Sequence, residues 1–235
     1  MLNPALDAGA AAAAFARDGR VLIHDFLDPA AARRLHHCLD TEVPWGLTYT
    51  ATLGADPMLL QANQLAAFDA NGRSAIRREA GNCGLRGFAF HYGTYMMVTA
   101  YLERRDPGLA LHFVVEFLNS HPFLDLMARI SDMDGLVKAN AQATRYHRGD
   151  FLKLHTDGPN PARKLAYVIN LTRNWREEWG GLLHFTDAQG RVLEAYYPAF
   201  NSLSLFRVPA WHFVSEVAEA ADHPRYAITG WVLDR

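Results

Sequence analysis

The sequence has few cysteines, no charge imbalance and no long apolar run, and each of these features excludes a class of protein. Only Cys38 and Cys83 occur in 235 residues, so a disulfide framework is excluded, and neither cysteine lies in a CxxC or Cys/His zinc pattern. The net charge of −2, from 23 basic and 25 acidic residues, indicates neither nucleic acid nor an anionic membrane as partner. No run approaches the roughly 20 apolar residues that a membrane span needs.

The N-terminal region contains no basic segment followed by an apolar core, which is the pattern of a secretory signal. The apolar run from Ala8 to Ala14 is short, includes Gly9, and is followed by Arg17 and Asp18. We therefore expect a helix at this position and a cytoplasmic enzyme as the default.

Half of the residues are hydrophobic and only 20% are charged, so the chain can bury a sizeable core. The N-terminal half predicts helices separated by short strands and one irregular region, 44–84. The expected helices are Ala5–Arg17, Asp28 to about Leu39, Pro57–Phe68, Leu109–Leu118 and a further one to about Ile130, and the expected strands are Val21–His24 and Arg86–Tyr92.

From Val137 the sequence changes to short strand-like runs separated by turn residues. The predicted strands are Val137–Tyr146, Phe151–His155, Leu165–Leu171, Leu182–Phe185, Val192–Ala195, Leu203–Val208, Phe213–Val217 and Tyr226–Leu233. This spacing favours a jelly roll or double-stranded barrel. We predict one domain over 1–235, mostly β with buttressing helices (α+β). Its helical and lid-like part would span about 1–136, and its metal-binding barrel about 137–235.

The sharpest local motif is His155-Thr156-Asp157. Residues i and i+2 of a strand point to the same side, so this imidazole and carboxylate can converge on one point. His212 offers a third ligand 55 residues after Asp157. Two histidines and one carboxylate on one face of a metal leave three positions open, the pattern of oxygen-activating iron(II) enzymes.

An arginine follows this motif at the start of the last predicted strand. Arg225, Ala227, Thr229 and Trp231 would share one face of that strand. An arginine there can bind a carboxylate through two parallel hydrogen bonds, as a dicarboxylic keto acid chelated to the metal requires. Tyr146 could add a phenol donor to the same pocket.

These residues resemble one known family. The shared pattern is Tyr146…Gly149…His155-x-Asp157…Trp175…Gly180-Gly181…Trp211-His212…Arg225-Tyr226-Ala227-Ile228-Thr229-Gly230-Trp231. It is similar to the prolyl-hydroxylase-type 2-oxoglutarate- and iron(II)-dependent oxygenases, most clearly over about 137–233.

The resemblance implies a double-stranded β-helix (cupin-like) fold with iron(II), 2-oxoglutarate and O₂ as cofactors, and ascorbate as a candidate reductant. It implies that His155, Asp157 and His212 hold the iron and form the catalytic centre. It further implies that Arg225 binds the far carboxylate of 2-oxoglutarate beside Tyr146 and Thr229. Asn170 falls near the place where the family often has a tyrosine.

The implied activity is hydroxylation of an unactivated C–H bond, with a prolyl residue of a protein or peptide as the first candidate substrate. A free amino acid or other small metabolite is the alternative substrate. A non-catalytic module that binds 2-oxoglutarate or a protein partner is an alternative of another class. A hydrolytic zinc enzyme is a further alternative, but it lacks a general-base glutamate beside the ligands and leaves Arg225 unexplained.

Two segments are candidates for substrate contacts, namely Phe88–Tyr92 and the loop 44–84. The basic cluster Arg73–Arg86 is expected either as a solvated face or as part of a lid. The remaining histidines have no partner at ligand spacing, and we expect them to be structural or exposed.

Overall fold

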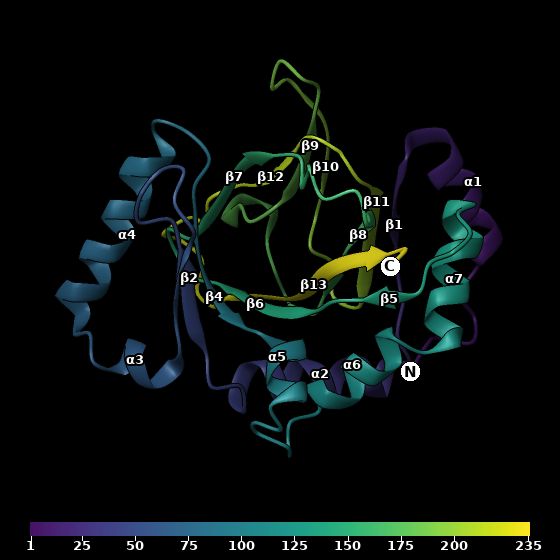
Figure 1. Ribbon diagram of the computed structural model, residues 1–235, viewed down its shortest axis with the longest axis horizontal. Helices are drawn as coiled ribbons and strands as arrows, with labels where there is room; N and C mark the ends of the chain where they lie inside the picture. The colour runs from purple at the N-terminus through teal and green to yellow at the C-terminus, as the bar shows by residue number, and fades with distance from the viewer.

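The computed structural model describes all 235 residues as a curled β-sheet with helices on its outer side. In Figure 1 the strands of the barrel occupy the centre, α3 and α4 lie on one flank, and α1 and α7 lie on the other. Helices α2, α5 and α6 lie beneath the barrel, and both chain termini are on the same side of the molecule.

The eight predicted strands of the C-terminal half are present. They are β6 (Gln142–Tyr146), β7 (Phe151–His155), β8 (Arg163–Asn170), β9 (Leu183–Thr186), β10 (Val192–Tyr196), β11 (Ser202–Arg207), β12 (His212–Val214) and β13 (Arg225–Leu233). They form two groups, β11-β8-β13-β6 and β7-β12-β9-β10, in the order of a double-stranded β-helix. The expected fold class is therefore confirmed.

Two sets of strand pairs hold the sheet together at its centre. The first and last of the eight strands, β6 and β13, pair antiparallel with Tyr146 opposite Arg225. Strand β4 (Phe90–Tyr95) pairs with both β6 and β7 and so joins the two groups. The short strand β5 (Lys138–Ala139) pairs with the end of β13.

The sheet extends beyond residues 137–235 into the N-terminal half of the chain. Strand β1 (Arg20–Ile23) extends the sheet beside β11, and β2 (Gly46–Tyr49) pairs with β4 and with β3 (Met58–Leu60). Backbone N–H and C=O groups at a sheet edge need partners, and these N-terminal strands supply them.

The region 44–84 differs from expectation. The predicted helix Pro57–Phe68 begins as β3, and only α3 (Ala62–Ala66) is helical. Helix α4 (Ala70–Gly84) lies where an irregular segment was expected; its first turn is capped by the Asp69 side chain. Packing of Ile76, Ala80 and Cys83 in a small apolar cluster with Phe151 stabilises α4 despite its glycines. The strand expected from Arg86 begins only at Phe90.

The other helices cover the outer face of the group β11-β8-β13-β6. They are α1 (Ala8–Asp18), α2 (Pro29–Thr41), α5 (Met97–Leu102), α6 (Leu111–Leu118) and α7 (His121–Ser131), with a 3₁₀ turn at Glu177–Trp179. Leu165 and Ile169 of β8 pack in their apolar core, whereas Ala166 and Val168 face the barrel interior. No helix combines the length and apolarity needed to cross a bilayer.

A substitution at Leu205 can test the packing of this core, because Leu205 is fully buried in β11, between β1 and β8. We expect Leu205→Ala to lower the free energy of unfolding by about 2–5 kcal/mol, since it removes buried methyl groups and leaves a cavity. Leu85→Ala, at a residue that is 84% exposed, is the matched control and should change it by less than about 0.5 kcal/mol. Urea denaturation would measure both, and equal effects would contradict this packing.

Candidate metal centre

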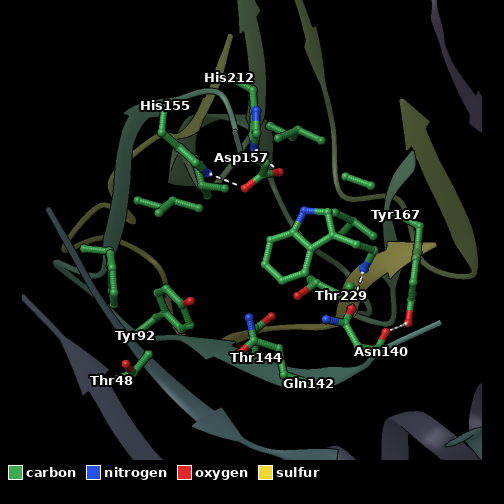
Figure 2. Close-up of a pocket in the computed structure, with 18 of the residues that line it drawn as sticks. Thr48, Tyr92, Asn140, Gln142, Thr144, His155, Asp157, Tyr167, His212 and Thr229 are labelled. Atoms are coloured by element: carbon green, nitrogen blue, oxygen red, sulfur yellow. Dashed lines mark hydrogen bonds and ion pairs between the residues drawn. The ribbon is translucent and has the colours of Figure 1, made fainter. Parts of the chain in front are cut away.

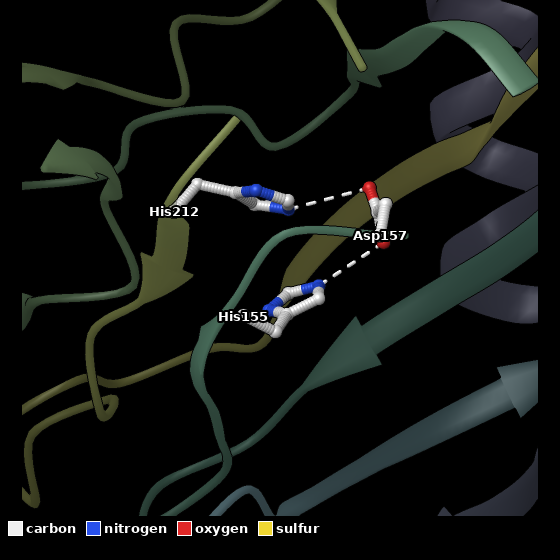
Figure 3. A group of neighbouring side chains, drawn as sticks. All are labelled: His155, Asp157 and His212. Carbon is white, nitrogen blue, oxygen red and sulfur yellow. Dashed lines mark ion pairs between the residues drawn. The ribbon is translucent and has the colours of Figure 1, made fainter. Parts of the chain in front are cut away.

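Three ligand-type side chains meet at one end of the barrel. His155 ends β7, His212 begins β12, and the two residues are directly paired across the strands. The pairing of β7 with β12 shifts register between this pair and the next, and such an irregularity re-aims side chains. Asp157 follows the strand with φ of 61°, a left-handed conformation that turns its carboxylate back toward the imidazoles. Figure 3 shows both histidines directed at Asp157.

The distances suit a single metal ion. The Asp157 carboxylate lies 3.2 Å from Nε2 of His155 and 3.6 Å from Nε2 of His212. One ligand atom from each residue lies within 4.8 Å of the others. Since metal–ligand bonds to nitrogen and oxygen are about 2.0–2.2 Å long, one ion can contact all three. No fourth protein ligand belongs to the group, so positions remain open.

The hydrogen bonds of the imidazoles prepare both rings for a metal. Nδ1 of His155 lies 2.9 Å from the carbonyl of Lys153, and Nδ1 of His212 lies 2.8 Å from that of Ala210. A carbonyl only accepts, so each Nδ1 carries the proton and each Nε2 presents its lone pair.

The charges agree with this arrangement. Burial and the neighbouring His155 lower the pKa of His212 to about 4, so this ring is neutral at pH 7. Burial opposes ionisation of Asp157, but the two histidines outweigh it and lower the pKa of its carboxyl. The anionic carboxylate of Asp157 and the neutral ring of His212 are thus presented to the metal.

A cavity of about 1120 Å³ opens from the three ligands into the barrel. Figure 2 shows the ligands on one side, with Tyr92, Gln142 and Thr144 across the space from them. Its inner wall is apolar near the metal ligands, where Leu183, Phe206 and Val214 line it. Asp157 is the only acidic residue in the lining.

Arg225 lies at the deep end of this cavity and is 2% exposed. Its Nη2 donates to Oδ1 of Asn170 at 3.2 Å, and its guanidinium lies 5.3 Å from the centre of the Tyr146 ring. Its Nε is buried with no hydrogen-bond partner, and no carboxylate pairs with it. Burial lowers the pKa of Arg225, yet a guanidinium stays charged in proteins, so the cavity holds an uncompensated cation.

Of the other three predicted site residues, two line the cavity and one does not. Tyr146 lines the cavity and stacks on Tyr92 at 5.0 Å between ring centres. Burial raises the pKa of Tyr146 well above its usual value, and it raises that of Tyr92 to about 12, so both phenols remain donors. Thr229 also lines the cavity. Asn170 does not; it instead positions Arg225 and donates to Ser202.

Several lining residues were not identified as site residues from the sequence. Four of them belong to no sequence motif, and only the folded sheet brings them to the cavity. They are Asn140, Gln142, Thr144 and Arg163. Leu59 from the 44–84 region and Phe88, Phe90 and Tyr92 from the aromatic segment do line it, in the regions where substrate contacts were expected. None of the arginines between 73 and 86 does, so the idea that they line the site as a lid is not supported.

Residues 141–233, which include all these ligands, match the sequence model of the 2OG-Fe(II) oxygenase superfamily. The barrel part of the chain therefore has the sequence pattern of this superfamily. Oxygenases of this superfamily require iron(II), 2-oxoglutarate and O₂, and the group His155, Asp157 and His212, with its open positions, fits iron(II). A search by sequence of curated proteins finds no match.

Solved structures share the fold at low sequence identity. A prolyl-4-hydroxylase from Pseudomonas putida is 19% identical, with a TM-score of 0.58 and coverage of 97% of this chain and 100% of the other. A Trichoplax adhaerens prolyl hydroxylase, bound to a hypoxia inducible factor peptide, is 17% identical, with a TM-score of 0.59 and coverage of 97% and 89%. An α-ketoglutarate-dependent epimerase of nogalamycin biosynthesis is 12% identical, with a TM-score of 0.57 and coverage of 97% and 82%.

Replacement of one ligand tests the metal centre directly. We expect His212→Ala to weaken Co(II) binding by roughly 100-fold or more, because loss of even an outer-shell partner typically costs 10–100-fold. The exposed His24→Ala is the control and should bind as the wild type does. Titration under argon, followed by the visible Co(II) bands, gives both affinities. Equal affinity in His212→Ala would mean that the metal is held elsewhere.

Proposed function

We propose that this oxygenase hydroxylates an unactivated C–H bond, with iron held by His155, Asp157 and His212 and the far carboxylate of 2-oxoglutarate held by Arg225. The observation that carries this proposal is the buried, unpaired Arg225 in the same cavity as the three ligands. A buried charge without a counter-charge is costly, and a dicarboxylate bound between this arginine and the metal would compensate it.

His155, Asp157 and His212 would hold iron(II), which would supply activation of O₂ coupled to decarboxylation of 2-oxoglutarate to succinate and CO₂. The residues of the chain provide orientation and a dry surrounding. Arg225 offers two parallel donors to a carboxylate, while Asn170 fixes its guanidinium from the far side. Thr229 and Tyr146 offer hydroxyl donors along the same wall. The apolar side chains around the ligands exclude water from the reacting face.

A prolyl residue in a protein or peptide is the first substrate to test, because two of the structurally similar proteins are prolyl hydroxylases. The similar epimerase shows that this fold also serves other chemistry. A free amino acid or small metabolite is the second candidate, and the charge of the cavity favours it, as argued below.

The decisive measurement is an anaerobic titration of the metal-free protein with iron(II) and 2-oxoglutarate. We expect the weak visible charge-transfer band of the chelate, and its loss in His155→Ala. Succinate formation on exposure to air would then exclude a non-catalytic binding module. Absence of the band in the wild-type protein would contradict the proposal and favour a zinc enzyme, which metal analysis of protein purified under argon would identify.

The proposed role of Arg225 can also be tested by measuring the free energy of unfolding with and without 2-oxoglutarate. In Arg225→Met the buried charge is removed at similar volume, so the ligand-free protein should keep its free energy of unfolding or gain about 1–4 kcal/mol. At a 2-oxoglutarate concentration of 100 Kd, bound ligand should stabilise the wild type by about 2.7 kcal/mol and the variant by almost nothing.

The matched control is Arg145→Met. Arg145 is the neighbour of Tyr146 on β6, but it packs over Trp45 on the other face of the strand and does not line the cavity. Denaturation with and without iron(II) and 2-oxoglutarate should show normal ligand stabilisation in this variant. Equal loss in both variants would mean that Arg225 has no special part in binding 2-oxoglutarate.

A further inference from the structure

The cavity contains a second arginine without an acidic partner. Arg163, at the start of β8, lines the cavity and is only partly buried. Its guanidinium carbon lies 3.7 Å from the centre of a Trp231 ring, and its Nη1 donates to the backbone carbonyl of Asp157 at 3.1 Å. These contacts fix the guanidinium immediately beside the metal ligands.

Most of the donors of Arg163 are unused by the protein. A guanidinium has five N–H donors, and the Asp157 carbonyl accepts from one nitrogen of this side chain. The C-terminal Asp234 pairs with Lys164 at 2.9 Å and leaves Arg163 without a counter-charge. Stacking on Trp231 holds the planar fork while leaving its edge free, the geometry in which arginine binds a carboxylate.

The charges that line the cavity also favour an anionic ligand at Arg163. Its ionic lining consists of Arg163, Arg225 and the carboxylate of Asp157. A divalent metal and the dianion of 2-oxoglutarate, both taken from the proposed function, cancel each other, and Asp157 cancels one arginine. One positive charge is left beside the reacting centre, and Arg225 is the arginine already assigned to 2-oxoglutarate. The primary substrate is the remaining source of an anion.

The opening of the cavity is apolar, in contrast to the charged surface around Arg163. Leu59, Phe88 and Trp211 line it and are 41%, 46% and 40% exposed. The Phe88 ring lies 5.0 Å from that of His155, so this apolar surface reaches the metal ligands. Exposed large apolar side chains gathered at one opening are a typical ligand-binding surface.

We propose that the primary substrate is a small carboxylic acid with an apolar body, such as a free or N-acylated apolar amino acid. Its carboxylate binds Arg163, and its body lies against Phe88, Leu59 and Trp211. This inference rests on the proposed function and specifies its substrate class. An internal prolyl residue carries no carboxylate, so it would leave the charge of Arg163 uncompensated.

Matched pairs of acids and amides test the proposal on the anaerobic wild-type protein loaded with iron(II) and 2-oxoglutarate. The probes are L-proline, L-leucine, L-phenylalanine and their N-acetyl derivatives, each beside its carboxamide, and one capped peptide with an internal proline. Binding is read from the shift of the charge-transfer band. We expect at least one acid to bind tenfold or more tightly than its carboxamide.

Variants assign the preference to Arg163. Arg163→Gln should abolish the discrimination between acid and amide, and Arg163→Lys should retain part of it, because an ammonium keeps the charge without the fork. The band of each variant without probe, measured first, shows whether its metal centre is intact. Arg33→Gln, at an exposed arginine of α2, is the control and should discriminate as the wild type does.

The outcomes separate this inference from the function on which it rests. If the band forms but no acid shifts it, if acids and amides bind equally, or if the prolyl peptide binds more tightly than every acid, the carboxylate inference is wrong and the oxygenase proposal stands. Discrimination that persists in Arg163→Gln also overturns it. If the wild-type protein forms no band, both fail together.

Discussion

The guanidinium of Arg225 lies inside the barrel with no acid to neutralise it, and much of the surrounding architecture serves to keep it there. Asn170 of β8 accepts its hydrogen bond, and Tyr146 of β6 places an aromatic face beside it. A buried cation is tolerated only when its hydrogen bonds and its charge are satisfied. The barrel supplies one hydrogen bond to Arg225 through Asn170, but no acidic side chain of the barrel neutralises its charge. The cavity above Arg225 therefore carries an uncompensated positive charge, which is why we propose that it binds an anion.

The metal centre depends on local backbone geometry more than on strand pleating. From the sequence, His155 and Asp157 were expected to converge because alternate residues of a strand share a face. In the structure the strand ends at His155, and the left-handed φ of Asp157 turns its carboxylate toward His212. The convergence of these three side chains was thus predictable from residue types and spacing, whereas the backbone geometry that brings them together was not. Aspartate tolerates this conformation better than most residues, which is one reason why it suits the position.

The C-terminal strands were predictable because they alternate and are separated by turns, which are local signals. In the N-terminal half the strand at Val21–His24 and most of the long helices were also predicted, but β2 and β3 were not, since they exist through pairing with distant segments. Helix α4 contains Gly72 and Gly81, and its stability comes from packing on the sheet rather than from helix propensity. Arg163 and Gln142 belong to no motif, so only the folded barrel identifies them as cavity residues. Motifs thus indicated a 2-oxoglutarate- and iron(II)-dependent oxygenase, and the tertiary structure was needed to identify the residues of the cavity wall.

The antiparallel pairing of β6 with β13 has a consequence for how the protein is made. Tyr146 and Arg225 face each other although a long stretch of chain, carrying six further strands, separates them. During synthesis the helices and the first strands leave the ribosome well before β13 does. Until then β6 and β8 expose unpaired edges, the kind of surface that promotes aggregation of nascent chains. The joining of β6 to β8 through β13 and the placement of Arg225 in the cavity are therefore the same late event, so a product truncated before β13 would lack both.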